Sequence, residues 1–154
     1  MNKIISICVA VIICFSVGFT AAYFQADAIQ TWYPFLNKQT LTPPNFIFPI
    51  VWSLLYLCMG ISIGLIWNTQ HTKRKTLRWL FSCQLLLNFT WSICFFYFQS
   101  PLLGFIDILL LDIFIIYYMI ESYPVKKISS LLFIPYTLWL LLATYLNGYI
   151  ILYN

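Results

Sequence analysis

Five long apolar runs follow one another along the chain, separated by shorter polar breaks. They cover residues 4–22, 46–67, 77–98, 102–120 and 128–149. A helix needs ~20 mostly apolar residues to cross a bilayer, and the runs are close to that length. The strands of a membrane β-barrel would show ~10-residue segments of alternating polarity, and the sequence has no such alternation. The pattern predicts an all-α fold: a single domain over residues 1–154 that forms an integral membrane bundle of five transmembrane helices.

The polar breaks predict how the helices are connected. The breaks at 99–101 and 121–127 are short, so the helices that flank them are expected to be antiparallel neighbours. The loop at 23–45 is much longer. A loop of that length in a compact domain is more often a lid or a binding element than a simple tether, and we expect one of those roles here.

The first apolar run has two interpretations. Lys3 before the run and the small-residue pattern Ala26-Asp27-Ala28 after it resemble a secretory signal with its cleavage site. The run is long for a signal, however, and it carries a stripe of small residues at i, i+4 spacing that suits close helix packing. We therefore expect a retained helix whose packing stripe consists of Ser6, Ala10, Cys14, Gly18 and Ala22.

Composition and charge agree with a membrane protein. Only 8% of the residues are charged and 62% are hydrophobic, whereas soluble domains carry ~25% charged residues. The net charge of +4 is explained by topology, so we expect no nucleic-acid partner. Lys38 is the one basic residue on its predicted side, which makes the N-terminus cytoplasmic and the first loop and C-terminus external. The cytoplasmic side would hold Lys3, Lys73, Arg74, Lys75, Arg78, Lys126 and Lys127.

The chain lacks the residue patterns of common enzyme and metal sites. His71 is the only histidine, and it lies in a polar loop among basic residues. The five cysteines fall inside apolar runs and form no CxxC pair, so we expect neither a metal site nor a required cofactor. The motifs GxSxG, HExxH and GxGxxG are missing from the sequence.

Two acidic residues lie inside an apolar run. Asp107 is near the outer end and is expected to reach water, whereas Asp112 is near the middle, where an ionised carboxylate costs ~3 kcal/mol. Asp112 should therefore face protein or be protonated, either as a hydrogen-bonded structural acid or as a proton relay. Five residues correspond to about 140° around a helix, so the two acids do not form a catalytic pair.

Polar residues in the third run share one helix face. Gln84, Asn88 and Ser92 recur at i, i+4 and i+8, and lipid cannot satisfy their hydrogen-bonding groups. This face must therefore point into the bundle. It could make hydrogen bonds between helices, or it could face a ligand.

Aromatic and small residues in the second and fifth runs predict a pocket wall and a packing surface. Trp139 and Ala143 share an i, i+4 row with Pro135 and Asn147, which suits a pocket wall. The pattern Gly60-xxx-Gly64 permits close approach of another helix, within the bundle or from a second copy in a homodimer. Two further indoles flank the basic loop and are expected at the membrane interface, Trp67 and Trp79.

These residues together resemble the translocator protein family, also called tryptophan-rich sensory proteins or peripheral benzodiazepine receptors. The segment 43–60, beginning PPNFIFPIVW, resembles the family block PPxxxFxPVWxxLYxxMG. Two further blocks fall in family order: Gln84 to Phe96, and Pro135-Tyr136 with Trp139 to Asn147. The resemblance runs from Trp32 to Asn154. Asn45 and Asp112 stand where aromatic residues are common in the family.

The resemblance implies a five-helix bundle that often dimerises and binds hydrophobic ligands beneath the first loop. The ligands it implies are porphyrins and other tetrapyrroles, benzodiazepine-site compounds and sterols. Sterols have the least support, because no basic residue follows Tyr149. Carried over residue by residue, the ligand-binding pocket would comprise Tyr33, Pro44, Phe46, Trp52, Asn88, Ser92, Trp139, Ala143 and Leu146.

Three functions are compatible with these features. A binding or sensing protein for porphyrins needs only a pre-formed apolar pocket with a few polar anchors. An enzyme for the light- and oxygen-dependent degradation of protoporphyrin would use Trp52 and Trp139 as catalytic electron donors. A transporter of small hydrophobic molecules is the third alternative. The expected partners are a porphyrin or another hydrophobic small molecule, membrane lipid, and a second copy of the chain.

Overall fold

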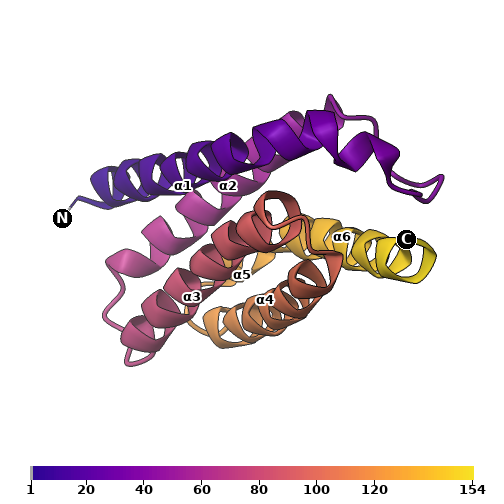
Figure 1. The fold of residues 1–154 in the computed structure, drawn as a ribbon. Coiled ribbons are helices and arrows are strands. Elements are labelled where there is room, and N and C mark those ends of the chain that lie inside the picture. Colours follow the sequence, from indigo (N-terminus) through magenta and orange to yellow (C-terminus); the bar gives the residue numbers. More distant parts are fainter. Residues whose placement is uncertain (1) are drawn as a thin grey trace.

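The computed structural model describes residues 2–154, and over that range the secondary structure is entirely helical. The five long helical segments pack into one bundle, with the two ends of the chain at opposite ends of it (Figure 1). Each of five segments is long and apolar enough to cross a membrane, which confirms the predicted fold class and makes the chain a multi-pass membrane protein. The helices are α1 (Lys3–Thr31), α2 (Ile47–Trp67), α3 (Arg74–Ser92), α4 (Pro101–Ser122), the short α5 (Lys127–Leu131) and α6 (Ile134–Tyr153).

Helix α1 extends well beyond the predicted run of 4–22. It continues to Thr31, so the connection to α2 covers 32–46 rather than 23–45. The reason is local, because residues 23–31 contain neither glycine nor proline and the first proline of the connection is Pro34. The helix is continuous through Ala26-Asp27-Ala28, and Ala28 is buried in the bundle.

The third and fifth runs also differ from a plain transmembrane helix. Helix α3 continues into η2, one turn of π-helix at Ile93–Tyr97. The fifth run is divided into α5 and α6, and Pro135 lies in the first turn of α6. Proline has no N–H to donate to the preceding turn, which explains why the helical hydrogen bonds are interrupted at this point.

Two ends of the bundle can be told apart by their loops. The first-loop end holds the connection 32–46 and the α3–α4 turn, and the basic end holds the α2–α3 and α4–α5 connections. At the basic end Lys73 forms an ion pair with Glu121 at 2.8 Å. The Arg78 guanidinium lies 4.5 Å from the centre of the Trp67 ring. Trp79 is 60% exposed, so it faces outward as predicted for an interfacial residue.

Glycines join α1 to α2 in the half of the bundle next to the basic end. A methyl group added at Gly60 would lie 2.5 Å from Val11 Cα, and one added at Gly64 would lie 2.6 Å from Ile7 Cα. The glycine pair therefore packs within the bundle and is not a free surface for a second copy. The small-residue stripe of α1 meets the same partner, since Ser6 accepts a hydrogen bond from Asn68 Nδ2 at 2.8 Å.

Three hydroxyl groups form a buried cluster in the same half. Ser62 Oγ lies 2.6 Å from Ser129 Oγ and 2.9 Å from Tyr118 Oη, and Ser129 Oγ also donates to the Ser62 carbonyl at 3.0 Å. All three side chains are buried. The cluster joins α2, α4 and α5 through hydrogen bonds that have no competition from water.

Both aspartates inside the membrane spans accept a hydrogen bond from a threonine. Asp112 Oδ2 accepts from Thr144 Oγ1 at 2.8 Å, so this carboxyl faces protein, as predicted. Asp107 Oδ1 accepts from Thr90 Oγ1 at 2.7 Å. The expectation that Asp107 reaches water is wrong, because the residue is only 9% exposed beneath α3. The two contacts tie α4 to α6 and to α3.

Candidate functional site

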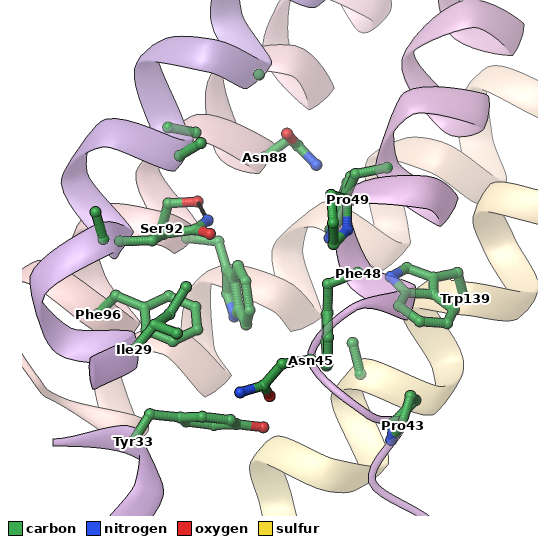
Figure 2. A pocket seen from close by; sticks show the side chains of 18 of the residues that line it. Ile29, Tyr33, Pro43, Asn45, Phe48, Pro49, Asn88, Ser92, Phe96 and Trp139 are labelled. Carbon is green, nitrogen blue, oxygen red and sulfur yellow. Dashed lines mark hydrogen bonds between the residues drawn. The ribbon is translucent and has the colours of Figure 1, made fainter. Parts of the chain in front are cut away.

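A cavity of about 430 Å³ opens between the helices at the first-loop end. Its wall is formed by α1, the start of α2, the end of α3 with η2, and α6, and the first loop lies at its mouth (Figure 2). The volume falls within the range of small-molecule sites. Most of the wall is apolar, with amide and hydroxyl groups at a few positions.

The sequence of α2 explains why the cavity is at this end. Along the face of α2 that meets α1, Gly64 and Gly60 are followed toward the first loop by Tyr56 and Trp52. The glycines let the two backbones touch, whereas the aromatic rings hold the helices apart. The Tyr56 ring already fills the space beside Gly18, and from there to the loop the gap becomes the cavity.

The inner end of the cavity is closed by a chain of hydrogen bonds. Tyr56 Oη donates to Asn88 Oδ1 at 2.7 Å, and Asn88 Nδ2 donates to Tyr136 Oη at 2.8 Å. The chain joins α2, α3 and α6. Asn88 therefore bonds between helices and also lines the cavity, with one N–H and one lone pair left for a ligand.

The other members of the predicted polar face on α3 are also buried. Ser92 Oγ accepts a hydrogen bond from Gln25 Nε2 of α1 at 2.6 Å, and both residues line the cavity. Gln84 is fully buried, and its Nε2 lies 4.0 Å from Met59 Sδ. The prediction that this face points into the bundle is confirmed for all three residues.

Three indole rings contribute to the cavity wall. Trp52 packs on Tyr56 with ring centres 5.6 Å apart, and Trp139 meets Phe48 edge to face at 5.7 Å. Trp91 stacks on Phe95 at 5.3 Å. Such flat, rigid side chains offer a large contact area to a flat aromatic ligand.

The π-helical turn η2 follows directly after this part of the wall. Trp91 and Ser92 at the end of α3 and Phe96 within η2 all line the cavity. A π-helix makes its backbone hydrogen bonds between residues five apart rather than four, and such turns are frequent at functional sites.

The first loop is held to α6 by side-chain amides. Asn37 N–H donates to Asn154 Oδ1 at 2.8 Å, and Asn154 Nδ2 donates back to the Asn37 carbonyl at 3.2 Å. Gln39 Nε2 donates to Tyr145 Oη at 3.1 Å. The loop therefore reaches across the cavity mouth from α1 to the end of α6.

Lys38 organises the start of that loop. Its ammonium donates to the carbonyls of Tyr33, Pro34 and Leu36 at 2.7, 3.2 and 3.4 Å. It also lies 4.8 Å from the centre of the Tyr33 ring. Partial burial lowers the pKa of Lys38, and burial raises the pKa of the Tyr33 hydroxyl. The 3₁₀ turn η1 (Tyr33–Phe35) is thereby fixed, with the Tyr33 ring on the cavity wall.

The structure brings seven of the nine predicted pocket residues together on the cavity wall. Pro44 and Phe46 are not among the lining residues, and Phe46 is 68% exposed. Their neighbours Pro43 and Asn45 line the cavity instead, because this segment is loop and turn and its side chains do not follow a helical spacing. The predicted residues on the wall are Tyr33, Trp52, Asn88, Ser92, Trp139, Ala143 and Leu146.

Sequence reasoning missed the contribution of α1 to this wall. Seven of the lining residues belong to α1 and share a helical spacing that continues past residue 22, and this spacing was the available signal. Trp91 lies within the family block from Gln84 to Phe96, and its indole also lines the cavity. The α1 residues are Gly18, Ala21, Ala22, Gln25, Ala26, Ile29 and Gln30.

The chemistry of the wall is that of a binding site for a hydrophobic molecule. None of the lining side chains in the described chain is Asp, Glu, Lys, Arg or His. Within residues 2–154 no three His, Cys, Asp or Glu side chains come together to hold a metal. Fold and cavity together define a five-span membrane protein with a largely apolar, aromatic-lined cavity at its first-loop end.

Comparison with known proteins identifies the family. The profile of the TspO/MBR family matches residues 10–153, and the chain belongs to this family. It is 38% identical over 152 residues to a tryptophan-rich protein TspO of Archaeoglobus fulgidus, with 99% of each chain covered. It is also 38% identical to a tryptophan-rich protein TspO of Chlorobaculum tepidum, over 100% of this chain and 99% of that relative. Identity to the translocator protein of Homo sapiens is 30%, covering 75% of this chain and 70% of the human one.

Proposed function

We propose that this protein binds porphyrins and benzodiazepine-site-type aromatic molecules in the cavity beneath its first loop. The observation that carries the proposal is the meeting of three indoles, Trp52, Trp91 and Trp139, on the wall of one apolar cavity. Aromatic stacking and buried apolar area dominate binding at such a site. Binding in this pocket needs no cofactor.

The geometry supports a particular placement of the ligand. A flat macrocycle stacks on Trp52 or Trp139, with its inner edge toward the free N–H and lone pair of Asn88. The first loop closes over the opposite edge, where Tyr33 and Asn45 lie at the far end of the cavity from Asn88 (Figure 2). In this arrangement the tryptophans supply affinity, while the amides orient the ligand.

We also propose that the first-loop end faces the outside of the cell. Seven of the eight Lys and Arg residues belong to the segments of the basic end, and only Lys38 belongs to the first loop. Short loops rich in Lys and Arg stay in the cytoplasm. A reporter fused to each terminus tests this orientation, and an external N-terminus would contradict it.

The test of ligand binding compares two tryptophans. Trp139→Ala removes an indole from the cavity wall and should weaken protoporphyrin binding about 30-fold, the equivalent of ~2 kcal/mol. Trp79→Ala removes an exposed indole outside the cavity and should leave the affinity unchanged. Affinity is measured by fluorescence titration in lipid nanodiscs. Equal losses in both variants would contradict the proposed site.

A second candidate function is the light- and oxygen-dependent degradation of protoporphyrin. It is favoured by the position of Trp52 and Trp139, oxidisable rings that line the same cavity that would enclose the macrocycle. An excited porphyrin can take an electron from an indole or pass its energy to oxygen, and an apolar pocket limits competing reactions with water.

The second candidate is tested by conservative substitution. Trp52→Phe and Trp139→Phe keep an aromatic ring but remove the more oxidisable indole. Porphyrin should stay bound while its light-driven loss slows several-fold, measured by absorbance with dark and oxygen-free controls. Unchanged bleaching in both variants, with the same product formed, would show that these tryptophans only pack the pocket.

A further inference from the structure

The polar groups of the cavity wall are all neutral. The amides are Gln25, Gln30, Asn45 and Asn88, and the Ser92 hydroxyl, two phenols and the N–H groups of three indoles complete the polar set. Burial raises the pKa of Tyr33, so this hydroxyl stays protonated at neutral pH. Each of these groups can donate or accept a hydrogen bond, but none offers a positive charge to an anion.

The basic residue of the first loop already donates its hydrogen bonds to backbone carbonyls. Lys38 directs its ammonium to three carbonyl oxygens at 2.7 to 3.4 Å and is not among the residues that line the cavity. The other seven Lys and Arg residues belong to segments at the opposite end of the bundle. Asp27, the acidic residue of α1, is exposed and also lies outside the lining.

The positions of these neutral and charged side chains determine which ligand groups the interior of the cavity can bind. An ionised carboxylate that leaves water without a cationic partner loses most of its hydration and gains only hydrogen bonds from amides. An uncharged polar group loses much less, and amides can satisfy it. The exposed amide of Asn45, by contrast, belongs to the first loop at the mouth of the cavity.

We propose that the cavity selects uncharged, flat aromatic ligands, and that ionised substituents of a bound ligand project from the mouth beside Asn45. This inference rests on the proposed binding function and names the ligand class of the same site. A porphyrin diester is then a better ligand for the interior than the corresponding dicarboxylate. A cation placed on the wall would change that preference.

The experiment uses two ligands with the same macrocycle: protoporphyrin, which has two carboxylates, and its dimethyl ester, which has none. Dissociation constants are measured at neutral pH in nanodiscs of uncharged lipid and corrected for the partitioning of each ligand into empty nanodiscs. The proteins are the full chain, Gln25→Lys and Asn45→Lys. The control Gln70→Lys adds the same charge to an exposed site in the α2–α3 loop.

The full chain should bind the diester at least as tightly as the dicarboxylate. Gln25→Lys should shift the ratio of the two dissociation constants toward the dicarboxylate about ten-fold, equivalent to ~1.4 kcal/mol. Asn45→Lys, at an exposed position that tolerates a charge, should shift the ratio in the same direction. Gln70→Lys should leave it unchanged.

Two results would overturn the inference while leaving the binding function intact. One is a full chain that binds both ligands but prefers the dicarboxylate ten-fold. The other is a ratio that stays within two-fold of the parent in both lysine variants of the wall. If neither porphyrin binds the full chain, the proposed function fails, and this inference fails with it.

Discussion

The two halves of the bundle use the same helices in opposite ways. Toward the basic end, α1 and α2 touch through Gly60 and Gly64, and three buried hydroxyls join α2 to α4 and α5. Toward the first loop, large aromatic side chains separate the helices and leave a cavity of about 430 Å³. We call these the packed half and the cavity half.

The difference shows how a small membrane protein keeps an open site stable. Lipid tails are as apolar as leucine, so helix association in a bilayer depends on close packing and hydrogen bonds. The packed half supplies both, while the cavity half gives up close packing for space. Substitutions in the packed half should therefore reduce stability, and those in the cavity half should mainly change ligand binding.

The largest effect is expected at the glycine contact. Gly60→Ala places a methyl group 2.5 Å from Val11 Cα, where the backbone cannot yield, and should destabilise the fold by ~3 kcal/mol. Gly148→Ala is the matched control, because its added methyl would meet only the edge of the Phe105 ring at 3.3 Å. Thermal unfolding in detergent measures both. Similar melting temperatures for the two variants would contradict the packed half as the source of stability.

A smaller loss is expected in the hydroxyl cluster. Ser129→Ala leaves the buried hydroxyls of Ser62 and Tyr118 with one fewer partner and should cost about 1–2 kcal/mol. Ser53→Ala removes an exposed serine hydroxyl on α2 that bonds only to its own helix, so its cost should be close to zero. Ligand affinity should not change in either protein. A Ser129→Ala variant as stable as the parent would contradict a stabilising role of the hydroxyl cluster.

Tyr56 lies at the boundary between the halves, so its substitution should affect both properties. Tyr56→Phe keeps the ring beside Gly18 but removes the donor to Asn88 Oδ1, which should cost about 1 kcal/mol of stability. Asn88 Oδ1 then loses this donor while Asn88 Nδ2 still donates to Tyr136 Oη, so a ligand can donate to the freed oxygen and porphyrin affinity should rise. Tyr117→Phe, at an exposed position on α4, is the control. A change in only one of the two properties would place Tyr56 wholly within one half.

The smallest effect on stability is expected at the loop contact. Asn154→Ala removes the two side-chain hydrogen bonds between Asn154 and Asn37, leaves the bond from Asn37 Nδ2 to the Tyr153 carbonyl, and should leave the melting temperature nearly unchanged. Porphyrin should dissociate about five-fold faster, since the two exposed hydrogen bonds between Asn154 and Asn37, which together contribute ~1 kcal/mol, no longer hold the loop. Stopped-flow fluorescence measures the rate, with Gln70→Ala as the control. An unchanged rate would mean that the loop does not limit ligand release.

Much of the architecture could be predicted from the sequence by itself. Apolar run length determines the number of spans, because a bilayer has a fixed thickness and backbone groups must be satisfied inside it. The inward face of Gln84, Asn88 and Ser92 follows from helical spacing and the same requirement. Seven of the nine residues that the resemblance implied lie on the cavity wall, with Trp52 and Trp139 among them.

Only the tertiary structure decided how these pieces meet. Gly60 and Gly64 pack against α1 rather than against a second copy of the chain. This contact depends on where α1 lies, and the local sequence around the glycines does not specify that position. The same holds for Pro43 and Asn45, which line the cavity in place of Pro44 and Phe46, since a non-helical segment has no fixed period. Gln25 reaches Ser92 across 67 positions of the sequence, so this contact exists only once the bundle is packed.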